Sequence, residues 1–115
     1  MILAAILALV VGVGMITQWA IFLATGQVPE LETEPFRIRF HLAGEFATAL
    51  VLLVAGVALL TDRAWSGWFY PLAVGMLLYT VIVSPGYFAD RGQWPLVAMF
   101  AVILVLALIG LVLVV

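Results

Sequence analysis

The chain contains no cysteine and no lysine, and it carries only four basic and six acidic side chains in 115 residues. Without cysteine there are no disulfides, thiolate metal sites or cysteine nucleophiles. Without lysine there is no Schiff-base chemistry. The four arginines are scattered singly, which excludes the basic face that nucleic-acid binding requires. We therefore expect no nucleic-acid partner.

Catalytic motifs are also missing. The chain has one histidine, and neither of its two serines lies in a nucleophile elbow or beside an oxyanion motif. No glycine-rich loop follows a strand-like segment, as phosphate binding would require. We do not expect this chain to be an enzyme.

Hydrophobic residues, by contrast, make up 68% of the chain, and charged residues only 9%. A soluble domain carries about a quarter charged residues, so most of this chain must contact lipid. Four apolar runs are long enough to cross a bilayer, over residues 2–25, 35–60, 69–84 and 95–115. The sequence predicts an all-α membrane protein, a single domain (1–115) of four transmembrane helices in an up-down-up-down bundle.

The connections between these runs contain the usual helix boundary residues. Pro35 suits the first turn of the second helix, and Pro85-Gly86 is expected to end the third. Trp65 and Trp68 are typical of a membrane interface. Because arginines are more frequent beside loops 26–36 and 85–94, these two loops are expected to face the cytoplasm, in a multi-pass protein of a prokaryotic plasma membrane.

Polar side chains from three of the predicted helices fall at one depth in the bilayer. A helix rises about 1.5 Å per residue, so Glu45 lies roughly 10 Å beyond Ile38, where the second helix should enter the hydrocarbon. Gln18 lies at a similar depth in the first helix, as do Tyr79 and Thr80 in the third. This common layer predicts a polar site on the side of the loop 26–36.

The polar residues of the second helix also share one face, because they are spaced by three and four. They are Glu34, Arg37, His41, Glu45 and Thr48. Gly44 lies on this face and would let a neighbouring helix approach closely. Met76, Thr80 and Ser84 form a parallel stripe on the third helix.

Glu45 allows two interpretations. An ionised carboxylate in a membrane is costly and is therefore a candidate for function. The alternative is a structural hydrogen bond from Glu45 to Gln18 or Tyr79. His41, one turn earlier, could bind a metal together with Glu45, relay a proton, or simply bond to the glutamate.

A metal site built on His41 and Glu45 would be incomplete, since zinc takes three or four protein ligands. Glu30, Glu32 and Glu34 are possible additional ligands if the loop folds back, and a second copy of the chain is another source. Two facing copies of His41 could also hold a haem. The sequence names no cofactor.

Two functions remain open. The first is a binding or transport module for a small solute or cation, working as a homo-oligomer, with Gln18, Tyr79, Thr80 and Thr48 lining the site around His41 and Glu45. The second is an accessory or scaffold subunit of a larger membrane complex, with no ligand of its own. Its helices would then pack through small residues, namely Ala8, Gly12, Gly44, Ala55, Gly56, Ala73 and Gly75.

Overall fold

The computed structural model describes residues 2–114, and within this range all regular structure is helical. Four of the five helices are long and apolar enough to cross a membrane, as the sequence predicts. The remaining helix is a single short turn (Glu30–Thr33) in the connection between the first two long helices. In chain order the helices are α1 (Ile2–Ala24), α2 (Glu30–Thr33), α3 (Pro35–Leu60), α4 (Ser66–Asp90) and α5 (Trp94–Val114).

The closest packing in the molecule joins α1 to α3, and it depends on glycine. A Cβ atom added at Gly12 would lie 3.0 Å from the carbonyl oxygen of Ala49, and one at Gly56 would lie 2.7 Å from the Leu9 Cγ and 3.1 Å from the Ala5 carbonyl oxygen. Such small residues let two helix backbones approach where no hydrophobic effect drives them together. Of four other small residues that were expected to pack helices together, three do so and one does not. Ala8, Ala55 and Ala73 are buried, whereas Gly75 has open space beside it.

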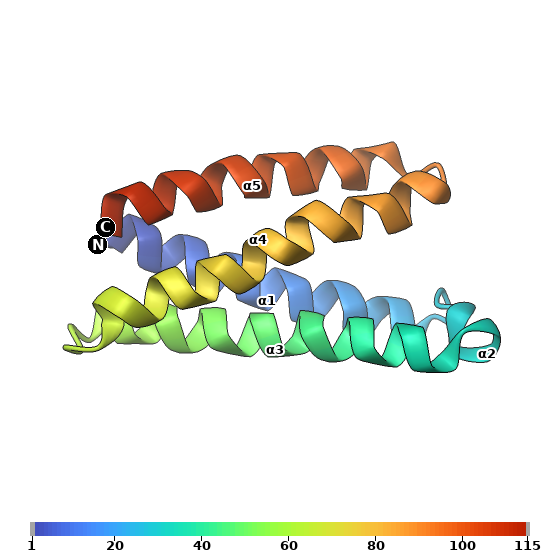
Figure 1. The fold of residues 1–115 in the computed structure, drawn as a ribbon, viewed down its shortest axis with the longest axis horizontal. Coiled ribbons are helices and arrows are strands. Elements are labelled where there is room, and N and C mark those ends of the chain that lie inside the picture. Colours follow the sequence, from blue (N-terminus) through green and yellow to red (C-terminus); the bar gives the residue numbers. More distant parts are fainter. Residues whose placement is uncertain (1, 115) are drawn as a thin grey trace.

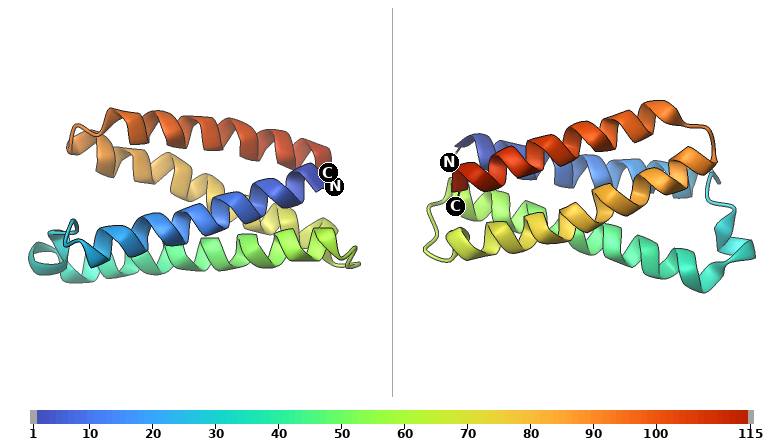
Figure 2. Two further views of the ribbon diagram at one scale, coloured as in Figure 1. Left: turned by 180° about the vertical axis from the view of Figure 1, so that it is seen from behind. Right: turned by 45° about the horizontal axis from the view of Figure 1, so that its top comes forward.

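The other two long helices cross this pair. In Figure 1, α4 begins beside α3 and ends beside α5, while α1 runs from the start of the chain beside α5 to its end beside α3. The two chain ends lie together at one end of the molecule, and α2 lies at the other. The left view of Figure 2 shows the α1–α3 pair and the α4–α5 pair separating towards α2, and the right view shows α3 diverging from α4 at this end.

Large aromatic rings occupy the space between these pairs. Phe88 of α4 lies 5.7 Å from Phe22 of α1 and 5.7 Å from Phe100 of α5, measured between ring centroids. Trp19 lies 6.0 Å from Phe88 and 5.8 Å from Tyr87. Trp19 and Phe88 are fully buried. At the opposite end the pairs meet through a small residue, since a Cβ added at Gly110 of α5 would lie 3.0 Å from the Leu7 Cδ2 of α1. Ring size at one end and glycine at the other therefore give the molecule its wedge shape.

The third long helix is longer than the predicted 69–84. It begins at Ser66 and continues through both Pro71 and Pro85 to Asp90, so the predicted loop 85–94 shrinks to the residues between α4 and α5. A proline inside a helix removes one backbone hydrogen bond. Here the continued helix buries Phe88 in the aromatic cluster, which offsets that loss. The predicted loop 26–36 likewise contains α2.

Replacement of Gly56 by leucine should destabilise the protein, because the new side chain would push α1 away from α3. Overpacking of this kind costs about 1–3 kcal/mol. We expect a lower unfolding midpoint in detergent, followed by circular dichroism. Gly75→Leu is the matched control, since nothing lies within 4 Å of a Cβ added there. Equal midpoints for the two variants would contradict the close α1–α3 contact.

Candidate functional site

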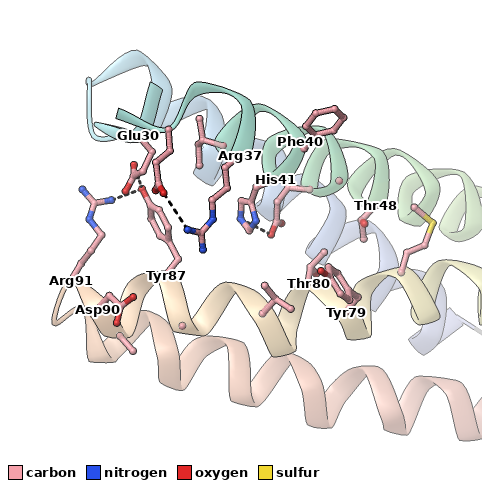
Figure 3. Close-up of a pocket in the computed structure, with 18 residues that line it drawn as sticks. Glu30, Arg37, Phe40, His41, Thr48, Tyr79, Thr80, Tyr87, Asp90 and Arg91 are labelled. Atoms are coloured by element: carbon pink, nitrogen blue, oxygen red, sulfur yellow. Dashed lines mark hydrogen bonds and ion pairs between the residues drawn. The ribbon is translucent and has the colours of Figure 1, made fainter. Parts of the chain in front are cut away.

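A groove with a volume of about 1000 Å³ lies between α3 and α4 at the α2 end of the molecule (Figure 3). It exists because α4 leaves α3 at this end to reach α5. Four carboxylates and two arginines line it, so the groove is acidic overall. The carboxylates are Glu30, Glu34, Glu45 and Asp90, and the arginines are Arg37 and Arg91.

Glu45 is the buried acid of this groove, with only 2% of its surface exposed. The Ser84 hydroxyl of α4 donates a hydrogen bond to the Glu45 Oε1. The His41 Nε2 lies 3.5 Å from the same oxygen. Within residues 2–114, the second carboxylate oxygen, Oε2, has no hydrogen-bond partner. One oxygen of Glu45 is thus held by the protein, whereas the other is buried and, within that range, unpaired, in a side chain that lines the groove.

The partner of Glu45 differs from the predicted ones. Gln18 is partly exposed and does not line the groove, and Tyr79, 71% exposed, lies on its rim. The interpretation of either residue as the hydrogen-bond partner is therefore wrong. Ser84 takes this role, and its place on the Met76–Thr80–Ser84 stripe was the available signal in the sequence. The spacing by four puts Thr80 and Ser84 on the face of α4 that meets α3.

The contribution of α1 comes from Trp19 rather than from Gln18. Its ring lies 5.5 Å from the His41 ring, edge to face, so it forms the wall behind the histidine. Successive residues of a helix point about 100° apart, and the larger apolar ring takes the buried direction. The indole N–H lies near the Glu45 carboxylate but makes no hydrogen bond to it.

The deeper part of the groove carries no charge. Thr48 of α3 and Thr80 of α4 are both buried there, as their predicted place in the site requires. The Thr80 hydroxyl donates to the Leu77 carbonyl 2.8 Å away, in its own helix. Gly44 lines the groove with open space beside it, so it does not serve the helix packing predicted for it. Its missing side chain instead leaves the groove wider.

A chain of polar contacts crosses the mouth of the groove, from Glu30 of α2 to the end of α4. The Tyr87 hydroxyl donates to the Glu30 Oε2 at 2.9 Å and accepts from the Arg91 guanidinium at 2.8 Å. The same guanidinium lies 5.1 Å from the centre of the Tyr87 ring. Arg37 and Glu34 form a separate pair at 3.3 Å. Tyr87 falls in the predicted loop 85–94, because the third helix was expected to end at Pro85, so the sequence did not indicate it as a site residue.

The candidate metal ligands are only partly brought together. His41 and Glu45 are adjacent, and Glu30 and Glu34 lie at the mouth, but Glu32 does not line the groove. Among the described residues no three histidine or acidic side chains are close enough to hold a metal ion. One copy of the chain therefore supplies a pair of ligands at this site, whereas a zinc site uses three or four.

The chain belongs to the family described as a domain of unknown function (DUF8058), whose profile matches residues 2–115. Neither the curated proteins nor the solved structures with which it was compared include a match.

Replacement of Ser84 by alanine should destabilise the protein, because a buried carboxylate would lose its hydrogen-bond donor. A hydrogen bond to a charged group contributes about 1.5–3 kcal/mol. We expect a lower unfolding midpoint in detergent for Ser84→Ala. Ser66→Ala removes the same atom from the start of α4, where no side-chain hydrogen bond is made, and should leave the midpoint unchanged. A Ser84→Ala protein as stable as Ser66→Ala would show that the contact does not hold α3 to α4.

Proposed function

We propose that this chain is a multi-pass membrane protein that binds a small positively charged solute in the groove between α3 and α4 and carries it across the bilayer. One observation supports this proposal above all others. Glu45 lines the groove but is buried among apolar helices, and one of its two oxygens has no hydrogen-bond partner among the described residues. An acid at this depth is costly to retain unless a cation or a proton offsets its charge.

The charge distribution along the groove fits a cationic solute. Acidic side chains outnumber arginines in the lining, and both arginines already contact oxygen atoms, of Glu34 and of Tyr87. An excess of one sign of charge in a concave site raises the local concentration of ions of the opposite sign. The mouth would gather cations, and Glu45 would hold one of them further in.

His41 gives the site a means of exchanging that cation for a proton. Its Nε2 is buried, faces the Glu45 carboxylate and makes no hydrogen bond among the described residues. A proton on His41 and a cation at Glu45 would oppose each other, because both would place a positive charge beside one carboxylate. This arrangement supports a transport cycle in which solute and proton alternate.

The proposed orientation follows from the arginines. In an up-down-up-down arrangement, Arg37, Arg39 and Arg91 lie on the α2 side of the bilayer, and Arg63 lies on the other. Basic residues are more frequent on the cytoplasmic side, so the groove mouth would face the cytoplasm of a prokaryotic cell. Four spanning helices are too few to enclose a wide path by themselves, so we expect a homo-oligomer.

A scaffold role without a ligand is the second candidate. It is favoured by α5, which exposes a long row of apolar side chains to its surroundings, among them Val102, Val105, Leu106, Ile109 and Val112. A larger membrane protein could cover this row, although lipid would also do so. Purification in mild detergent separates the two functions, since a scaffold subunit would bring a stoichiometric partner with it.

A cation that occupies the site should stabilise the purified protein. Binding at a hundredfold excess over Kd adds about 2.7 kcal/mol to the free energy of unfolding. We expect at least one member of a panel of inorganic and organic cations to raise the unfolding midpoint of the wild-type protein. The same cation should not raise the unfolding midpoint of Glu45→Gln. Proteoliposomes should take it up only when they contain protein that retains Glu45.

Glu32→Gln is the matched control, because it removes the same charge from α2 at a position outside the groove. It should respond to the cation as the wild type does. A response that survives in Glu45→Gln, or uptake that is the same in both variants, would refute the proposal.

A further inference from the structure

We infer that the solute is a protonated amine with an apolar body, which donates an N–H hydrogen bond to the Glu45 carboxylate and reaches the groove sideways from the lipid. This inference rests on the proposed function and specifies its substrate class. Three features of the groove carry it: the free acceptor on Glu45, the uncharged surface around it and the exposed apolar rim.

The first feature selects a hydrogen-bond donor. The Glu45 Oε1 accepts from Ser84 and faces His41, whereas the Oε2 is buried and has no partner within residues 2–114. A buried acceptor without a donor is costly, and a charged N–H group satisfies both its hydrogen bonding and its charge. A quaternary ammonium has no N–H to donate. A bare divalent metal would need more ligands than His41 and Glu45 offer.

The second feature selects an apolar body with a single charged end. Beyond Glu45 the groove is lined by small or uncharged side chains, from Gly44 and Thr48 on α3 and from Met76 and Thr80 on α4. The one buried acid stands at the edge of this uncharged region. The volume of about 1000 Å³ is at the upper end of the range for sites that hold drug-sized molecules. An inorganic ion alone would leave most of this space unused.

The third feature gives the entry route. Phe40 of α3 and Tyr79 of α4 line opposite sides of the groove, and they are 80% and 71% exposed. Figure 3 shows Phe40 projecting away from α4, so it does not close the gap. Both residues are within helices long enough to span the bilayer, so their exposed surfaces face acyl chains. An amine with an apolar body, already dissolved in the bilayer, can pass between them without crossing the charged mouth.

The test compares three ligands with the same phenylethyl body, titrated calorimetrically into the full chain in lipid nanodiscs, with empty nanodiscs subtracted. They are 2-phenylethylamine, its trimethylammonium analogue and 2-phenylethanol. We expect the amine to bind saturably, at least tenfold more tightly than the quaternary analogue. The alcohol should bind weakest, because it has no charge to pair with Glu45.

Two variants, each with a matched control, locate the binding. Glu45→Gln should weaken amine binding at least tenfold, while its control, Glu32→Gln, should bind the amine as the wild type does. Gly44→Leu should fill the groove and abolish amine binding without lowering the unfolding midpoint, because a Cβ added at Gly44 meets nothing within 4 Å. Gly75→Leu is its control, since it lies outside the groove with equally open surroundings and should keep full affinity.

The outcomes separate this inference from the proposed function. Equal affinity for the amine and the quaternary analogue would overturn the N–H requirement and leave a cation site in place. Binding of an inorganic cation alone, dependent on Glu45, would overturn the substrate class and again leave the proposed function intact. If the alcohol binds as tightly as the amine, or if no cation of any class binds, both the inference and the proposed function fail.

Discussion

The carboxylate of Glu45, buried in a helix that is otherwise apolar, constrains much of the structure. An ionised acid in such surroundings needs a donor for each oxygen, and the fold supplies one through Ser84 of α4. That contact joins α3 to α4. His41 faces the same oxygen, and Trp19 lies behind His41, so three long helices contribute to the surroundings of one side chain.

The contrast between the two ends of the molecule explains why a groove exists at all. Near the chain ends, glycines allow helices to approach closely, as Gly56 does between α1 and α3 and Gly110 does beside Tyr70. Towards α2, the rings of Trp19 and Phe88 hold the helix pairs apart and fill the centre. Gly44 of α3 has no side chain to fill the space left between α3 and α4, which keeps the groove open there.

The sequence predicts the four long helices well, since apolar runs of this length are unambiguous, and it predicts the layer that holds His41, Glu45, Thr48 and Thr80. Its errors share one cause, which is that packing overrides local signals. Proline was expected to end the third helix at residue 84, but burial of Phe88 extends α4 and brings Tyr87 to the groove mouth. Gln18 was preferred because it is polar, yet the direction of α1 is set by its larger neighbour Trp19. The depth of a residue in the bilayer can be counted from its position along a helix. The hydrogen-bond partner of Glu45 depends also on how each neighbouring helix is rotated about its axis, and the spacing of polar residues alone did not resolve this rotation.

Difference infrared spectroscopy of the carboxyl bands tests most directly whether Glu45 is a cation site. Spectra of the protein in lipid would be recorded with and without 2-phenylethylamine, for the wild type and for Glu45→Gln. The account predicts a change in a carboxyl or carboxylate band when the amine is added, which is absent from Glu45→Gln. Identical difference spectra for the two proteins would show that the Glu45 carboxylate does not meet the solute, and they would contradict the central claim.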